Sequence, residues 1–149
     1  MNLRLRLDCT TRLPVPAVGK FRRWARAALS GWRRRSVAIG VRIVGAAESR
    51  TLNLRYRGKD QPTNVLSFPY EAPPGARTDV LGDLVICAPL VRREARAEHK
   101  DEQAHWAHLV VHGILHLRGY DHENARQAAV MEDREVRILR RLGFPNPYT

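Results

Sequence analysis

The chain has 149 residues and a hydrophobic content of 44%, which fit one domain with a real core, and no apolar run approaches the roughly 20 residues that span a bilayer. The net charge of +11 is concentrated in the first 59 residues, which hold 15 basic residues and two acids, against 11 and 13 in the remainder. A basic half beside a near-neutral half suggests a polyanion such as nucleic acid as a partner, although arginine-rich surfaces also arise from the codon bias of GC-rich genomes. We see no separate basic amphipathic anchor for a membrane surface.

The first part of the chain alternates predicted strands and helices. The alternating leucines of residues 3–7 predict a strand. Two prolines then open a segment, from residue 14 to Trp32, with apolar residues at helical spacing. We expect its basic face to contribute to polyanion binding through Lys20, Arg22, Arg23 and Arg26. A second strand over residues 37–43 and a short helix over residues 46–56 follow.

The rest of the chain predicts two more strands and three helices. The strands cover residues 65–68 and 80–87, with a polar loop rich in Pro and Gly between them. They could pair as a hairpin, which would make the sheet mixed. The helices cover residues 89–98, 102–118 and 123–142. The expected fold is therefore one α/β domain over residues 1–149, with a small mixed four-stranded sheet backed by helices.

Three histidines at the end of the predicted helix 102–118 have the spacing of a metal site. His112 and His116 are four residues apart, so both imidazoles lie on one helix face. Gly119 stands where a helix often ends in left-handed geometry, and the chain that reverses there can return His122 to the same ion. We therefore predict a metal site formed by the helix and the turn that follows it.

The type of ligand favours zinc, because neutral imidazole is among its preferred ligands, although nickel, copper or iron would also accept three nitrogens. Three protein ligands leave a fourth position for water, which marks a catalytic site more than a structural one. A zinc protease of similar spacing would carry a Glu base after the first His, whereas here that place is Gly113. We expect Gly113 to leave space beside the ion.

Several other polar residues lie near the cluster in sequence, and some of them allow two interpretations. His105 and His108 extend the same helix face; His108 could hydrogen-bond a metal ligand, or both could be ordinary core histidines. His99 is expected to be a solvated helix residue. Asp121 could orient a ligand or act on substrate, or it could only stabilise the turn.

Cys9, like Cys87, is expected to be a reduced, half-buried thiol of a cytosolic protein, because no secretory signal precedes it.

Three sequence blocks resemble the YbeY family, bacterial metal-dependent endoribonucleases of rRNA maturation and ribosome quality control. The blocks are AHWAHLVVHGILHLRGYDH (residues 104–122), LNLRYRGKDQPTNVLSFPY (52–70) and LGDLVICAP (81–89), and the ending LGFPNPY is similar too. The resemblance implies that His112, His116 and His122 are zinc ligands. It also implies an α/β fold and a functional role for Arg57, whose planar fork matches two phosphate oxygens.

The resemblance implies a zinc-dependent, single-strand-specific endoribonuclease that acts in 16S rRNA 3′ end maturation and ribosome quality control. We expect Arg57 and His112 to be catalytic. Ser67 and Phe68, on an edge strand beside the metal, could contact RNA, Phe68 by stacking on a base, although the favoured interpretation of Phe68 is a core residue. An RNA phosphodiester needs no Glu base if metal-activated water or the ribose 2′-OH attacks. The expected partners are rRNA, the small ribosomal subunit, ribosomal proteins and a ribosome-associated GTPase in a bacterial cytoplasm. The alternative is a non-catalytic ribosome-assembly factor with a structural metal; Gly113 argues against a protease.

Overall fold

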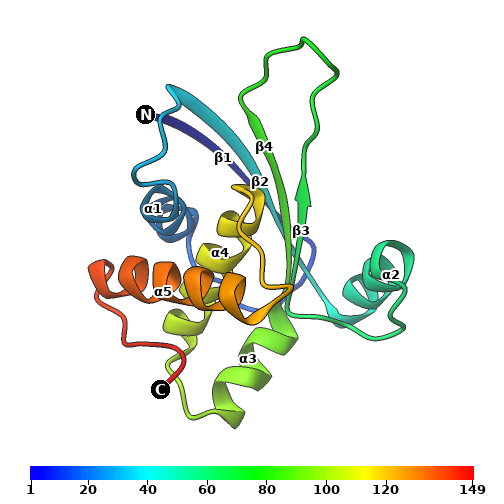
Figure 1. Ribbon diagram of the computed structural model, residues 1–149. Coiled ribbons are helices and arrows are strands. Elements are labelled where there is room, and N and C mark those ends of the chain that lie inside the picture. The colour runs from blue at the N-terminus through cyan, green and yellow to red at the C-terminus, as the bar shows by residue number, and fades with distance from the viewer.

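A four-stranded mixed sheet forms the centre of the computed structural model, which describes residues 1–149 (Figure 1). The strands lie in the order β1-β2-β4-β3. The first three of these are parallel, and β3 pairs antiparallel with β4 at the edge. The predicted hairpin and mixed sheet are therefore confirmed. The strand bounds are β1 (Asn2–Cys9), β2 (Ser36–Val44), β3 (Val65–Pro69) and β4 (Val80–Cys87).

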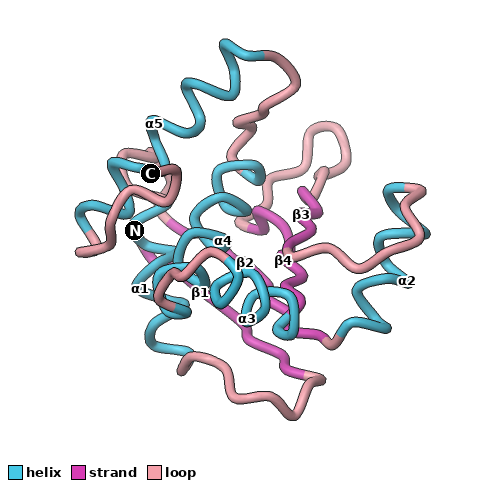
Figure 2. Tube along the Cα trace, turned by 90° about the horizontal axis from the view of Figure 1, so that it is seen from below, coloured by secondary structure: helices cyan, strands magenta, loops and turns pink.

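Five helices surround the sheet, and they divide unequally between its faces. Figures 1 and 2 show α1, α4 and α5 together on one side, with α3 at their end and α2 apart on the other side. This arrangement confirms the predicted α/β class of a single small domain. No helix has the length and apolarity required to cross a membrane. The helix bounds are α1 (Val18–Ala28), α2 (Ala46–Arg57), α3 (Ala88–Ala97), α4 (Glu102–Leu117) and α5 (Ala125–Arg141).

Helix α4 is the central helix of the domain, and its burial decides where the histidines point. Ten of its 16 residues are buried, because it packs against the sheet and against both α1 and α5. On the α1 side, the Phe21 ring meets Trp24 at 5.4 Å and Trp106 at 5.8 Å between centroids, edge to face in both cases. Fully burying a side chain such as Phe21 contributes about 2 kcal/mol. The one partly accessible stripe of α4 carries His108, His112 and His116.

Some predicted boundaries and environments differ from those observed. Helix α1 begins at Val18, past both prolines, because its N-cap Ala17 is extended (φ −67°, ψ 152°). Trp32 lies beyond the end of α1, after a turn at Gly31 with φ 79°. His99 is not a helix residue: it follows the end of α3 in left-handed geometry, with φ 54°.

The two cysteines are both free, as expected, but neither is half-buried. Cys9 is exposed at the end of β1, and Cys87 is fully buried at the end of β4. Cys87 is buried because it lies on a strand that is covered on both faces. The sequence pattern of β4 alone does not specify that both faces are covered.

Candidate metal centre and the cavity around it

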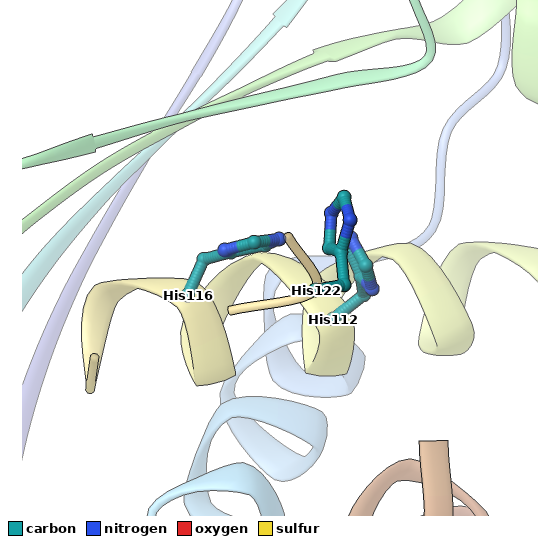
Figure 3. A group of neighbouring side chains, drawn as sticks. All are labelled: His112, His116 and His122. Atoms are coloured by element: carbon teal, nitrogen blue, oxygen red, sulfur yellow. The ribbon is translucent and has the colours of Figure 1, made fainter. Parts of the chain in front are cut away.

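Three imidazoles converge at the carboxyl end of α4 and form a candidate metal centre (Figure 3). One ring nitrogen from each of His112, His116 and His122 lies within 4.8 Å of the other two. The ring centroids are 4.7 Å apart for His112 and His116, 4.9 Å for His116 and His122, and 5.7 Å for His112 and His122. Three nitrogen donors at this spacing suit a divalent transition metal.

The third histidine reaches the cluster because α4 ends in a Schellman motif. The N–H of Tyr120 donates to the Leu115 carbonyl at 3.0 Å, and the N–H of Gly119 donates to the His116 carbonyl at 2.9 Å. Gly119 adopts φ 102°, as its place in the sequence predicted. The carboxylate of Asp121 then accepts the N–H of His122 at 2.7 Å, which stabilises the turn in the way the second reading of Asp121 proposed.

We expect Gly119→Val to weaken zinc binding as severely as the loss of a ligand. A β-branched residue at this positive φ costs on the order of 1–3 kcal/mol, so the chain would leave the geometry that returns His122. Zinc affinity measured by competition with a chromophoric chelator tests this. Gly75→Val is the matched control, because Gly75 also has a positive φ (80°) and open space around its Cα but lies in the β3–β4 loop. Equal zinc affinity of the Gly119 variant and wild type would contradict the proposed role of the turn.

A buried carboxylate from α5 orients the first histidine of the cluster. Glu135 is fully buried, and its Oε1 lies 2.6 Å from Nδ1 of His112. An ionised carboxylate can only accept, so Nδ1 of His112 carries the proton and Nε2 is free to bind a metal. Hydrogen bonding of this kind fixes the tautomer of metal-binding histidines and raises their basicity.

The same carboxylate is held by the carboxyl-terminal segment. The hydroxyl of Tyr148 donates to Oε2 of Glu135, and His108 Nε2 lies 3.4 Å from Oε1. Burial opposes the charged form of Glu135, but hydrogen bonds from His108 and His112, with that of Tyr148, outweigh it and lower its pKa to about 2. Burial raises the pKa of the Tyr148 phenol, and the bond to Glu135 raises it further. Glu135 is therefore an anion, and Tyr148 is a permanent donor to it.

We expect Glu135→Gln to lower zinc affinity by about 10–100-fold, the usual cost of losing a partner of a metal-binding histidine. Tyr148→Phe, which keeps the ring and removes only the hydroxyl, should lower the affinity in the same direction by less. Glu132→Gln is the control, because Glu132 is exposed on the same helix and undergoes the same change of charge. Zinc affinity is read beside the unfolding midpoint of metal-free protein, which separates positioning from folding. Wild-type affinity in Glu135→Gln would remove the assigned role.

The environment of the cluster also favours neutral imidazole, the form that binds metal. Burial lowers the pKa of His116, and the neighbouring His112 and His122 lower it further. A second donor group, His108, His112 and Glu135, also brings its atoms within 4.8 Å of one another. In that group Glu135 is fully buried and already hydrogen-bonded, so no position opens to a substrate. A catalytic metal needs such a position, which favours the three-histidine set.

The cluster lies in a cavity of about 680 Å³ between α4, β3 and the end of α2. Its lining includes two cations, Arg57 and Lys59, and one acid, Asp121. Arg57 is exposed, and its Nη2 donates to the Ser67 carbonyl at 3.2 Å. The structure thus brings Arg57 and the three histidines, which are far apart in sequence, to one cavity. A phosphate bound there would meet a planar guanidinium beside the three imidazoles.

Two buried polar side chains of α2 position Arg57. Ser49 Oγ donates to the Thr63 carbonyl at 2.9 Å, and Asn53 Nδ2 donates to the Gln61 carbonyl at 2.8 Å. These bonds attach the segment after α2 to the helix itself. The helix ends at Arg57 because Gly58 adopts left-handed geometry, with φ 73°. The guanidinium of Arg57 therefore lies at the end of a helix that is hydrogen-bonded to the segment that follows it.

One sequence expectation about this cavity is wrong, and one of the two interpretations of Phe68 is excluded. Gly113 does not line the cavity of the histidine cluster: a Cβ there would lie 2.7 Å from Leu84 Cδ2 and 3.3 Å from Ser67 Oγ, so the glycine permits close packing of α4 on the sheet. Phe68 does not line the cavity. Its ring meets Tyr56 edge to face at 5.1 Å, in the groove beside α2, because it alternates with Ser67 along β3.

The remaining candidates have defined places. Ser67 lines the cavity, and its hydroxyl donates to the Gly113 carbonyl at 3.2 Å, which ties the edge strand to α4. His105 is a buried core histidine, with Nε2 2.8 Å from Glu94 Oε1. His108 lies beside the His112 ring, at 6.2 Å between centroids, and its Nε2 is 3.4 Å from Glu135 Oε1 and 3.3 Å from the Tyr148 hydroxyl. The predicted basic face of α1, at Arg22, Arg23 and Arg26, is exposed but does not line the cavity.

A small mixed sheet that gathers three imidazoles and an arginine around one open cavity is typical of a metal-dependent hydrolase. Comparison with known proteins gives the family. The family model described as Endoribonuclease YbeY matches residues 16–143, and the chain belongs to this family. Proteins named Endoribonuclease YbeY from Alkalilimnicola ehrlichii and Methylococcus capsulatus are 54% and 53% identical; the matches cover 99% and 97% of this chain and 91% and 94% of those proteins.

A solved structure agrees in fold. The solution structure of TM1509 from Thermotoga maritima superposes with a TM-score of 0.61 at 26% identity, over 92% of this chain and 86% of that one. The superposed region covers nearly the whole chain and therefore most of its first 45 residues, which none of the three sequence blocks reaches.

Proposed function

We propose that the chain is a zinc-dependent endoribonuclease that cuts single-stranded RNA at the three-histidine cluster. One observation carries the proposal: three imidazole nitrogens within 4.8 Å of one another line an open cavity that Arg57 also lines. An open position at such a cluster admits a substrate, whereas a structural metal site is closed by a fourth protein ligand. Membership of the endoribonuclease family supports RNA as the substrate.

The donor set supports zinc in particular. All three donors are imidazoles, Glu135 holds His112 in the tautomer with Nε2 free, and burial keeps His116 neutral. When bound, the ion would supply Lewis acidity, by stabilising negative charge on the reacting phosphate and by making water more acidic. Elemental analysis of purified protein distinguishes zinc from nickel, copper or iron, which would accept the same three nitrogens.

The residues around the cavity divide the remaining work. Arg57 binds two oxygens of the scissile phosphate through its guanidinium and favours the transition state, in which more charge gathers on those oxygens. His112, held by Glu135, is the imidazole whose orientation is most constrained. Asp121 is the acid in the lining, and the oxygen that does not accept the His122 N–H is available to orient water or a ribose hydroxyl. Lys59 adds a second positive charge for the RNA backbone.

The biological substrate we propose is ribosomal RNA, with action in 16S rRNA 3′ end maturation and ribosome quality control in the bacterial cytoplasm. The basic first part of the chain, at +13 over 59 residues, supports a large polyanionic partner. The small ribosomal subunit, ribosomal proteins and a ribosome-associated GTPase would be the natural partners. A non-catalytic assembly factor with a structural metal would have the same partners, so a cleavage assay separates the two.

Cleavage of two matched RNA fragments that contain the 3′ end of precursor 16S rRNA tests the function. In one fragment the end is single-stranded, and in the other a complementary strand covers it. We expect the zinc-loaded protein to cut the first and spare the second. Binding of both without cleavage of either would transfer the proposal to the assembly factor. Equal cleavage of both would refute single-strand specificity.

A further inference from the structure

A second cavity, of about 1010 Å³, adjoins the histidine cavity and shares two lining residues with it, Pro69 and Gly119. Three segments form it: the connection from α1 to β2, the β3–β4 loop and the end of α4. Figure 1 shows the first two of these at the same upper end of the sheet. The turn that returns His122 to the cluster therefore also forms part of the wall of this second cavity.

The charge of the second cavity is strongly positive. Its lining holds five arginines and one acid, Asp79, which is 3.3 Å from Arg4 outside the cavity. Arg33, Arg35 and Arg77 are exposed and form no ion pair. Unpaired cations grouped in a concave surface attract a polyanion more strongly than the same charges spread over a convex one.

The other two arginines have structural contacts that shape the cavity. Arg118 donates to the Ala28 carbonyl at 2.7 Å, and its guanidinium lies 5.3 Å from the centre of the Trp32 ring. Arg34 lies 4.4 Å from the same ring. Tyr70 also lines the cavity and is 50% exposed. Sites that bind single-stranded nucleic acid without sequence preference combine cations along the backbone with an aromatic side chain beside them.

We propose that the second cavity binds the sugar-phosphate backbone of the RNA segment that flanks the cleavage site. The strand would pass from the histidine cluster across Pro69 and Gly119 and continue past Arg33, Arg35 and Arg77, with a base against Tyr70. This inference rests on the proposed RNA cleavage, which places the cut at the histidine cluster. It adds a division of roles to that function: the second cavity binds a long single strand, and the first cavity carries out the chemistry.

The test compares two triple variants with the same loss of charge. Arg33→Gln, Arg35→Gln and Arg77→Gln together remove the three arginines of the second cavity that have neither an ion pair nor a contact with the Trp32 ring. Arg93→Gln, Arg96→Gln and Arg140→Gln together are the control, because these arginines are exposed, form no ion pair and line neither cavity. The probes are dye-labelled 2′-O-methyl oligouridylates of about 16 and about 4 nucleotides, the range that one single-strand module covers. Binding is read by fluorescence anisotropy across a salt series.

We expect the cavity variant to bind the long probe about tenfold more weakly, with a salt slope lower by about two, because each single-strand phosphate contact contributes roughly 0.7. Its affinity for the short probe, and its turnover at saturating RNA, should stay within about twofold of wild type, because these arginines do not contact the reacting phosphate. Loss of a contact made in the transition state would cost far more than twofold. Similar losses in the control variant, or on the short probe, would overturn the proposal in favour of diffuse attraction. A wild type that shows this binding pattern but cuts no RNA would refute the proposed function and leave the binding site standing.

Discussion

Replacement of any one of His112, His116 and His122 by alanine is expected to abolish stoichiometric zinc binding and RNA cleavage together. Each variant removes one of only three protein donors, so the loss of zinc affinity should exceed the roughly 10–100-fold that is typical of residues behind the ligands. Metal content by elemental analysis after dialysis, and cleavage of single-stranded RNA by the same samples, measure the effect.

The control for these variants is His99→Ala, because His99 is an exposed histidine beyond α3 and belongs to neither donor group. It should retain one zinc per chain and full activity. If all three cluster variants kept stoichiometric zinc, the assignment of the metal to this cluster would be wrong. Zinc loss confined to His112→Ala would instead favour the group that contains His108 and Glu135.

Arg57→Lys is expected to keep most of the RNA affinity and to lose turnover by about 10²–10³-fold, the cost of removing one donor that stabilises transition-state charge. Lysine preserves the positive charge but cannot form the two parallel hydrogen bonds of a guanidinium. An interaction made mainly in the transition state lowers kcat rather than raising KM. Saturation kinetics on single-stranded RNA across a salt series separate the two parameters.

Arg55→Lys is the matched control, because Arg55 is exposed in the same last turn of α2 but does not line the cavity. Its kinetics should be those of wild type, and the zinc content of both variants should be unchanged. If Arg57→Lys raised KM and left kcat intact, Arg57 would be a binding residue only. Comparison with the triple variant of Arg33, Arg35 and Arg77 would then show whether the two cavities share one binding role.

The part of the site that the sequence predicted is the part governed by local geometry. The four-residue spacing of His112 and His116 specifies one face of a helix whatever the rest of the fold does. The preference of glycine for positive φ specifies the turn at Gly119 in the same way. Helical and strand periodicity likewise located every strand and helix. The start of α1 was misplaced by a few residues, because the helix begins after the prolines and the N-cap at Ala17.

The parts that sequence reasoning missed depend on tertiary packing. Glu135 lies 23 residues beyond His112, on a helix whose register against α4 no local pattern reveals. The ending LGFPNPY was recognised as similar to the family, yet only the folded chain shows that Tyr148 reaches Glu135. A buried acid in an otherwise apolar stripe of α5 was the available signal, because such a charge is rarely buried without a partner.

The wrong expectation for Gly113 and the excluded interpretation of Phe68 share one physical cause. Alternation along β3 requires Ser67 and Phe68 to face opposite sides of the sheet, but only the position of α4 decides which of them meets the metal cavity. Gly113 follows His112 by about 100° around the helix, which turns it toward Leu84 and the sheet instead of the cluster. Both cases therefore concern which face is covered, and neither concerns the type of element.

Zinc titration of chelator-stripped protein, with bound zinc and cleavage of single-stranded RNA measured in the same samples, tests the central claim most directly. We predict that the stripped protein cuts no RNA and that activity rises in proportion to occupancy until one zinc per chain is bound. His112→Ala, carried through the same titration, should show neither the binding nor the rise. Cleavage that is full in the stripped protein, or that stays absent in protein with one zinc per chain, would contradict the claim that RNA is cut at a metal held by the three histidines.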